Sequence, residues 1–231
     1  MKACVVLFSG GIDSTTALYW ARQGYQIVHP LTFDYGQRHR VEIELAAITA
    51  ARLGLEPVLL KVDLTQVGGS ALTDRHIPVP KLESLPEPGA WPPLTYVPFR
   101  NGIFLALAAA WAEPRAIQDL VCGFNIIDSP DYPDTRPEFV EAMERAIRAG
   151  TYSDFKGRPI RIVAPFIRQK KSEIIRLGLE LGADYSDSVS CYDGKEVPCF
   201  HCPACLLRQR AWAEVGREDP LLVRLEKEGK L

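Results

Sequence analysis

The sequence predicts an α/β protein with a doubly wound, mainly parallel sheet, followed by a small C-terminal module. Up to residue 181, short apolar runs alternate with segments in which apolar residues recur at helical spacing. Strands that alternate with helices form parallel sheets, because each helix returns the chain to the edge at which the next strand starts. Beyond residue 182 the composition shifts to Ser, Asp, Cys and Gly. We therefore expect a first domain over residues 1–184 and a small module over residues 185–231.

The first expected element is a buried strand over residues 3–8, because this run is continuously apolar and rich in β-branched residues and then stops at Ser9 and two glycines. A helix is expected from Ser14 to Gly24, since small apolar residues recur there at helical spacing and glycine is a common helix stop. The same reasoning gives the remaining elements in order: strand 26–33, helix 41–53, strand 57–62, helix 102–112, strand 119–124, helix 137–148, strand 161–164 and helix 172–181.

Residues 63–99 interrupt this alternation with turn-forming residues, among them seven prolines between residues 78 and 98. A loop of this length inside a compact domain is usually a lid, a binding loop or a disordered segment. The sequence pattern leaves these alternatives open.

The composition excludes several classes of protein. The chain has 231 residues, of which 47% are hydrophobic and 24% charged, so disordered and fibrous classes are excluded. The longest apolar run covers residues 103–112, which is far shorter than the roughly 20 residues that cross a bilayer. Since no charged stretch followed by an apolar one opens the sequence, we expect no leader peptide. We therefore expect a cytoplasmic protein. A formal charge of −2 argues against binding nucleic acid through the whole surface.

The turn after the first strand, Ser9-Gly10-Gly11-Ile12-Asp13-Ser14, has the features of a phosphate-binding loop. Between a strand and a helix, backbone N–H groups and the positive end of the helix dipole converge on an anion. The turn lacks the Gly-Lys-Ser/Thr of a Walker A loop and the glycine spacing of dinucleotide folds. The alternative is an ordinary strand-to-helix turn, in which Asp13 would be an N-cap.

Four cysteines near the C-terminus have the spacing of a structural zinc site: Cys191, Cys199, Cys202 and Cys205 are separated by seven, two and two residues. His201 lies between two of them, but four thiolates already complete a tetrahedral shell. A redox-active pair or a sulfur-transfer site is the competing interpretation. Arg208 and Arg210 supply too little positive charge for a nucleic-acid reader, and we expect them to cap or decorate a helix that begins near Pro203.

The Ser9–Ser14 turn resembles the PP-loop of the ATP pyrophosphatase superfamily, whose members cut ATP between the α and β phosphates. Further segments are similar to the motifs of one branch, the 7-cyano-7-deazaguanine synthase family, and the resemblance spans residues 3 to about 212. These segments are Asp34-Tyr35-Gly36-Gln37-Arg38-His39, Val97-Pro98-Phe99-Arg100-Asn101, Tyr132-Pro133-Asp134-Thr135-Arg136, Ser190-Cys191-Tyr192 and Cys205-Leu206-Leu207-Arg208. The resemblance implies an adenine nucleotide alpha hydrolase-like, Rossmann-like fold, with the nucleotide at the carboxyl ends of the strands.

The resemblance also implies a reaction and its cofactors. The family converts 7-carboxy-7-deazaguanine, ammonia and ATP to 7-cyano-7-deazaguanine, a precursor of queuosine, through an adenylated carboxylate and an amide. It implies one structural zinc ion per chain on the four cysteines, Mg²⁺ bound with ATP, and a homodimer. We expect no membrane and no direct nucleic-acid partner.

Carried over residue by residue, the resemblance assigns three groups of residues to the site. ATP is expected on Phe8, Ser9, Gly10, Gly11, Ile12, Asp13, Ser14, Thr15, Thr16, Ala17 and Leu18. Catalysis is expected from Asp13, which would hold Mg²⁺ against the pyrophosphate, and from Arg100, Lys170 and Lys171 near the α-phosphate. The deazaguanine is expected on Tyr35, Gln37, Arg38, Tyr132, Asp134 and Arg136. The family motifs at the end of residues 63–99 favour a lid over a disordered loop.

Two positions depart from the family pattern. The family usually has Cys where this chain has Thr135, which excludes a cysteine nucleophile there, and Gly where it has Phe200, which could alter the tightness of the zinc knuckle. Two other functions stay open. A PP-loop enzyme could adenylate another target, such as a tRNA base, or the chain could be a nucleotide sensor or zinc-dependent interaction module without turnover.

Overall fold

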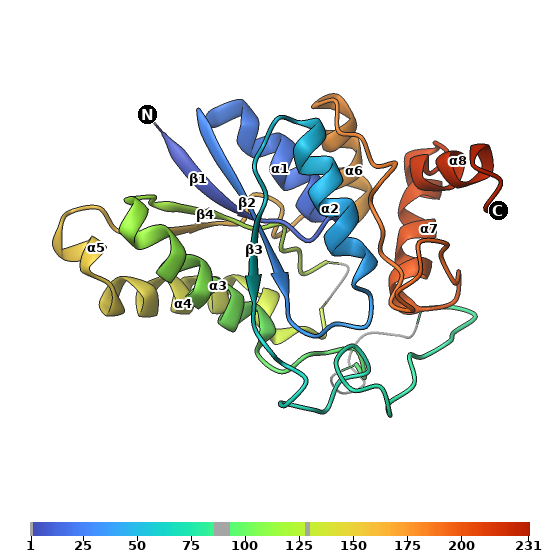
Figure 1. Cartoon of the computed structure of the whole chain (residues 1–231), viewed down its shortest axis with the longest axis horizontal. Coiled ribbons are helices and arrows are strands. Elements are labelled where there is room, and N and C mark those ends of the chain that lie inside the picture. Colours follow the sequence, from blue (N-terminus) through green and yellow to red (C-terminus); the bar gives the residue numbers. More distant parts are fainter. Residues whose placement is uncertain (1, 86–92, 128–129) are drawn as a thin grey trace.

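The computed structural model describes residues 2–85, 93–127 and 130–231. Its centre is one parallel sheet in the order β3-β2-β1-β4-β5 (Figure 1). The strands are β1 (Ala3–Leu7), β2 (Ile27–Asp34), β3 (Val58–Lys61), β4 (Asp119–Val121) and β5 (Arg161–Val163). The chain builds outward from β1 in one direction and then returns to build from β1 in the other. This order confirms the predicted doubly wound sheet and makes the β1–β4 boundary its switch point.

Helices cover both faces of the sheet (Figure 1). One face packs against α1 (Ile12–Gly24), α2 (Val41–Arg52) and α6 (Lys171–Glu180), and the other against α3 (Arg100–Ala112) and α4 (Pro137–Gly150). Alternation along β1 explains the two cores, since Val6 lies with Leu18 on the first face and Val5 with Leu105 on the second.

The predicted strands and helices all occur, and their ends agree with the prediction to within three residues. The largest shift is in β4, which ends at Val121 rather than at residue 124, because the following residues leave the sheet to line a cavity. The sequence analysis did not predict α5 (Tyr152–Phe155), α8 (Pro220–Lys227) or two short 3-10 turns, Glu113–Arg115 and Pro133–Thr135. The start of α8 does carry a sequence signal, because Asp219 accepts a hydrogen bond from Leu221 N (3.0 Å) and Pro220 follows as the first helical residue.

The C-terminal segment consists of an irregular stretch, then α7 (Pro203–Val215), predicted to begin near Pro203, and α8. Its helix α7 packs on the sheet domain, because Trp212 lies in one buried cluster with Ile175 of α6 and Tyr19 of α1. The expectation that Arg208 caps or decorates this helix is wrong, because its side chain is buried. Its guanidinium pairs with Asp219 and donates to Ser188 O (2.6 Å), which ties α7 to α8.

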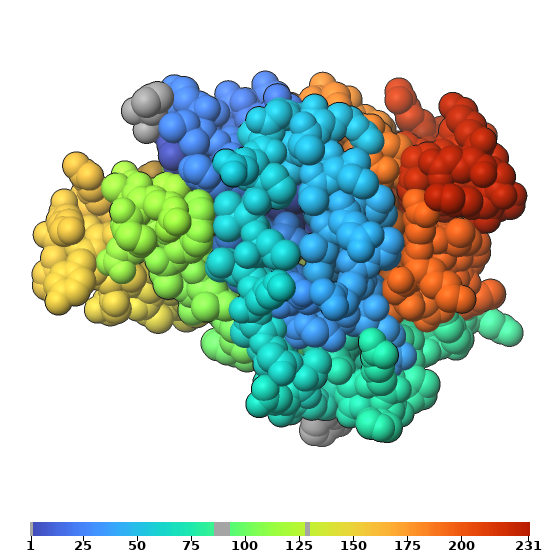
Figure 2. Space-filling view, viewed as in Figure 1, coloured from blue at the N-terminus to red at the C-terminus, as the bar shows by residue number. Residues whose placement is uncertain are grey.

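Within residues 63–85 and 93–99 the structure contains turns but no helix or strand, as predicted. In the view of Figure 2 this segment runs along the lower edge of the molecule and reaches the C-terminal segment. Leu82 N donates to His201 O (2.8 Å), and Lys81 forms an ion pair with Asp193. Among the described residues, no helix is long and apolar enough to cross a membrane.

Candidate active site

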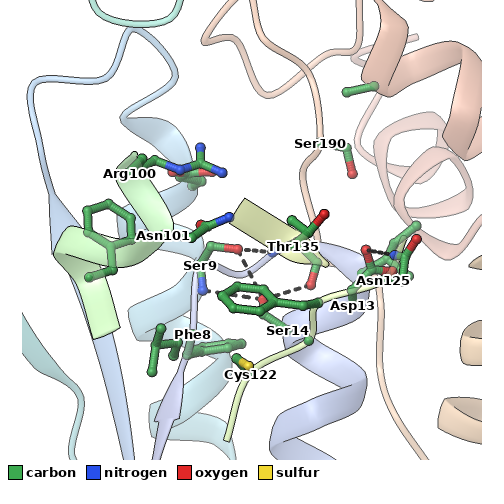
Figure 3. A pocket seen from close by; sticks show the side chains of 18 of the residues that line it. Phe8, Ser9, Asp13, Ser14, Arg100, Asn101, Cys122, Asn125, Thr135 and Ser190 are labelled. Atoms are coloured by element: carbon green, nitrogen blue, oxygen red, sulfur yellow. Dashed lines mark hydrogen bonds between the residues drawn. The ribbon is translucent and has the colours of Figure 1, made fainter. Parts of the chain in front are cut away.

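A cavity of about 300 Å³ opens at the carboxyl ends of β1 and β4, the switch point of the sheet (Figure 3). Ligands of open α/β sheets bind in this crevice, because loops that diverge from neighbouring strands leave a gap there. Its walls come from the β1–α1 turn, the end of β2, the first turns of α2, α3 and α6, the residues after β4, and the segment around residue 190.

The β1–α1 turn forms one end of the cavity, and hydrogen bonds of its own serine hydroxyl groups fix its conformation. Ser9 N and Gly11 O bond to Ser14 Oγ (3.3 and 3.0 Å), and the Ser9 and Ser14 hydroxyls are 3.1 Å apart. Gly10 has φ +81°, and a Cβ there would lie 3.1 Å from Cβ of Ala46, so glycine permits both the turn and its packing on α2. No described side chain caps α1, so the N–H groups of its first turn face the cavity end that would hold an anion.

Asp13 is the charged centre of this end. Its Oδ2 accepts from Lys171 Nζ (2.5 Å) at the start of α6 and from Asn125 Nδ2 (3.1 Å) after β4. Its Oδ1 is buried and accepts no hydrogen bond from any described residue. A buried carboxylate oxygen without a donor fits a hard cation such as Mg²⁺, so the donor set here suits magnesium held with a phosphate chain.

Aromatic and basic side chains form the other part of the cavity. The rings of Phe33 and Phe104 stack at 4.1 Å, and Tyr35 meets Phe104 edge to face at 5.3 Å. Arg100 Nη1 donates to Tyr35 Oη (3.3 Å), and no described carboxylate pairs with this guanidinium. Burial raises the pKa of Tyr35 to about 12, so its hydroxyl stays protonated at neutral pH.

A carboxylate and an imidazole complete this part. Glu42 Oε1 lies 3.4 Å from His39 Nε2 and accepts from Gln37 Nε2 (3.1 Å). The Nδ1 atom of His39 is buried and has no hydrogen-bond partner among the described residues. His39 and Glu42 line the cavity, and the Tyr192 ring lies 5.8 Å from the imidazole.

The structure brings nine of the predicted site residues to the cavity wall: Phe8, Ser9, Gly11, Ile12, Asp13, Ser14, Tyr35, Arg100 and Lys171. The other predicted residues lie outside the lining: Gly10, Thr15, Thr16, Ala17, Leu18, Gln37, Arg38, Tyr132, Asp134, Arg136 and Lys170. Their predicted contacts with ATP or substrate stay predictions.

Several of these outer residues make internal contacts instead. Thr16 Oγ1 lies 2.7 Å from Tyr185 Oη in the core, and Arg38 donates to Asp74 O (2.9 Å) in the long loop. Asp134 accepts from Asn101 N (3.0 Å) at the start of α3. Lys170 is exposed and precedes α6, so only the second lysine of the pair reaches Asp13.

The sequence analysis missed two residues that shape the phosphate end. Asn125 holds Asp13, and a Cβ on Gly123 would lie 2.7 Å from the Asp13 carbonyl. Both follow a predicted strand directly, so the rule that ligands bind at carboxyl ends of strands could have indicated them. Glu42 carried no such signal, because it lies inside a helix.

The sulfur atoms of Cys191, Cys199, Cys202 and Cys205 lie within 4.8 Å of one another and form no disulfide. Backbone N–H groups donate to two of the sulfurs, from Cys199 N to Cys191 Sγ and from Cys202 N to Cys199 Sγ (both 3.3 Å). Hydrogen bonds from the neighbouring thiols lower the pKa of Cys202, which favours a thiolate. This four-cysteine cluster could hold a metal ion and, as expected, does not include His201.

The two departures from the family pattern have different structural settings. Phe200 has φ +62°, a left-handed conformation that glycine adopts without steric cost. Thr135 lines the cavity, and its hydroxyl donates to Tyr132 O (2.9 Å).

Comparisons with known proteins agree with the resemblance of the motifs. A 7-cyano-7-deazaguanine synthase of Nostoc punctiforme is 46% identical over 223 residues, covering 96% of this chain and 99% of the relative. One from Anaeromyxobacter sp. (strain Fw109-5) is 47% identical, with 96% of each chain covered. A solved complex of a 4-thiouridine synthetase with RNA and bound ATP is 19% identical, has a TM-score of 0.49, and covers 99% of this chain and 53% of that one. The model of the family described as queuosine biosynthesis protein QueC matches residues 3–216, and the chain therefore belongs to that family.

Proposed function

We propose that this protein is an ATP-dependent carbon–nitrogen ligase that converts 7-carboxy-7-deazaguanine and ammonia to 7-cyano-7-deazaguanine in queuosine biosynthesis. The observation that carries the proposal is the shared cavity. It joins a phosphate-binding turn to an aromatic, charged wall in a chain whose relatives bear the name of this synthase.

The first step is adenylation of the substrate's carboxylate. A carboxylate oxygen attacks the α-phosphorus of ATP, and the bond from that phosphorus to pyrophosphate breaks. The first-turn N–H groups of α1 and the Lys171 ammonium, which is held by Asp13, face the charge that develops on the leaving group. Mg²⁺, when bound at Asp13, neutralises further charge on the pyrophosphate.

The second half of the reaction uses the same site again. Ammonia attacks the acyl carbon, AMP leaves and one proton is lost, which gives the amide. The amide oxygen then attacks the α-phosphorus of a second ATP, and pyrophosphate leaves again. Loss of two protons from nitrogen, with departure of AMP, gives the nitrile. Catalysis on this route is mostly positioning and charge neutralisation. We assign Arg100 to the substrate's carboxylate, because its guanidinium borders the cavity and pairs with no described acid.

We propose that the four-cysteine cluster holds one structural zinc ion, since four clustered sulfurs with N–H donors form a closed tetrathiolate shell. The C-terminal module over residues 185–231, the homodimer, the cytoplasmic location and the absence of a nucleic-acid partner also stay predictions. The homodimer rests on the family resemblance alone.

Mass spectrometry tests the proposal directly. Purified, zinc-loaded protein is incubated with Mg-ATP, ammonium and 7-carboxy-7-deazaguanine, and the masses of the deazapurine and of the nucleotides are followed together. We expect a transient amide, then the nitrile, with AMP and pyrophosphate. An unchanged deazapurine, with protein that is folded and zinc-loaded, would refute the assignment and favour another adenylated substrate.

A further inference from the structure

We propose that Glu42 reads the N1–H and 2-amino edge of the deazaguanine and so selects a guanine-type base. This inference rests on the proposed function and deepens it, because it assigns the wall of the cavity that recognises the base. Glu42 lies on the first turn of α2, after the segment Asp34–His39 and outside the other segments quoted above.

The carboxylate of Glu42 is available to a ligand. Its side chain is 14% exposed and borders the cavity, so the group is largely desolvated yet reachable from inside. Oε1 has two internal neighbours, Gln37 and His39, whereas no described residue donates to Oε2. Oε2 is not among the buried polar atoms that lack a partner, so it is open to the cavity, and a ligand with N–H donors can bond to it.

The environment fixes the direction in which the carboxylate points. Gln37 is buried, accepts from Tyr35 N (2.8 Å), and donates both to Phe33 O (3.0 Å) and to Glu42 Oε1 (3.1 Å). Its amide is therefore committed to the protein, and its role is to position Glu42 rather than to touch substrate. A fixed carboxylate can accept two parallel hydrogen bonds, since each oxygen has two lone pairs.

Charge complementarity indicates what the ligand is. The Arg100 guanidinium lies on the same cavity wall, separated from Glu42 by Tyr35 and His39, and no ion pair joins it to a described acid. A half-buried cation and a half-buried anion on one cavity wall that do not pair with each other suit a ligand that carries an acceptor edge and a donor edge. 7-Carboxy-7-deazaguanine has both. Its carboxylate and O6 face one direction, N1–H and the 2-amino group face another, and its rings can stack on the aromatic wall.

The test compares two substrates on three proteins. The substrates are 7-carboxy-7-deazaguanine and its analogue without the 2-amino group. The proteins are the unmodified chain, Glu42→Gln, and Glu44→Gln, a matched control that removes an exposed carboxylate from the same helix. The readouts are kcat and KM for each substrate and for ammonium, and calorimetric binding of each deazapurine without ATP.

We expect the unmodified chain and Glu44→Gln to prefer the guanine-type substrate by roughly 10- to 100-fold in kcat/KM. Glu42→Gln should lose that preference, mainly through KM and equilibrium binding, with the KM for ATP unchanged. If Glu42→Gln is unstable, Glu42→Asp replaces it in the test. Aspartate keeps the negative charge but is one methylene shorter, so its carboxylate lies farther from the base, and we expect weaker binding of the guanine-type substrate.

Other results overturn the inference. Unchanged discrimination in a folded Glu42→Gln protein would show that another group reads the base. A raised KM for ammonium with unchanged binding of the deazapurine would show that Glu42 serves ammonia instead. Failure of the proposed function is distinct from both, because the unmodified chain would then neither convert nor bind 7-carboxy-7-deazaguanine.

Discussion

Gly123 gives the sharpest test of how the switch point holds the phosphate-binding turn. A Cβ at this position would lie 2.7 Å from the C and O atoms of Asp13 and 3.0 Å from Ser14 N, all of them backbone atoms of the turn. Ordinary contacts begin near 3.4 Å, so Gly123→Ala must displace the turn by about 0.7 Å. The φ of Gly123 is not left-handed, so alanine itself suits the backbone and the effect arises from the contact alone.

Overpacking of this kind costs about 1–3 kcal/mol, and a displacement approaching 1 Å in a catalytic loop can lower a rate roughly 100-fold. We therefore expect Gly123→Ala to lower kcat/KM for ATP roughly 10- to 100-fold, measured by pyrophosphate release, and to lower the thermal unfolding midpoint. Gly150→Ala is the matched control, because it ends α4 and a Cβ there meets nothing within 4 Å. An ATP KM and a rate within twofold of the unmodified protein would contradict the proposed packing of the turn.

Three further predictions test the positive charge of Lys171, the four-cysteine cluster and the left-handed backbone of Phe200. Lys171→Met should lower kcat/KM for ATP at least roughly 100-fold, because it removes the cation at Asp13, whereas Lys170→Met should stay within about twofold; equal losses would contradict this assignment. Cys199→Ser should lower bound zinc, measured by elemental analysis, well below one ion per chain, and full zinc content would exclude this ligand set. Phe200→Gly should raise the free energy of unfolding of the zinc-loaded protein by about 0.5–1 kcal/mol in urea titrations, because it removes left-handed strain; a decrease would mean that the Phe200 ring contributes more than its backbone costs.

Local sequence patterns were enough to predict the sheet and the phosphate-binding turn. The alternation of apolar runs with helical spacing predicted the doubly wound sheet, because most strand–helix pairs are encoded within about 30 contiguous residues; the exception is β3 and α3, which the long loop separates. The turn from Ser9 to Ser14 was equally local, and six of the eleven residues predicted to bind ATP line the cavity. The ends of elements were less predictable, since tertiary packing decides where β4 stops.

Of the residues predicted to bind the deazaguanine, Tyr35 alone lines the cavity, and the reason is physical. Gln37 and Arg38 follow the carboxyl end of β2, as substrate ligands often do, yet their polar atoms are used to hold Glu42 and the long loop. The Arg38 bond depends on the path of backbone far along the chain, and the local Gln37 bonds depend on how the loop after β2 turns; residue spacing alone encodes neither. Glu42 borders the cavity where α2 packs closely on Gly10, and a single sequence does not reveal this contact between elements.

The four-cysteine cluster also supports the cavity wall and is more than an appendage to the sheet domain. Cys191, Cys202 and Cys205 share a buried cluster with Leu45 of α2 and with residues of the long loop. Tyr192 follows Cys191 directly and lines the cavity, as do residues of α7. A change in composition near residue 185 marks a boundary along the chain, but the cavity crosses it in space. A metal ion that fixes the cysteines would therefore also fix the aromatic wall against which the base is expected to stack.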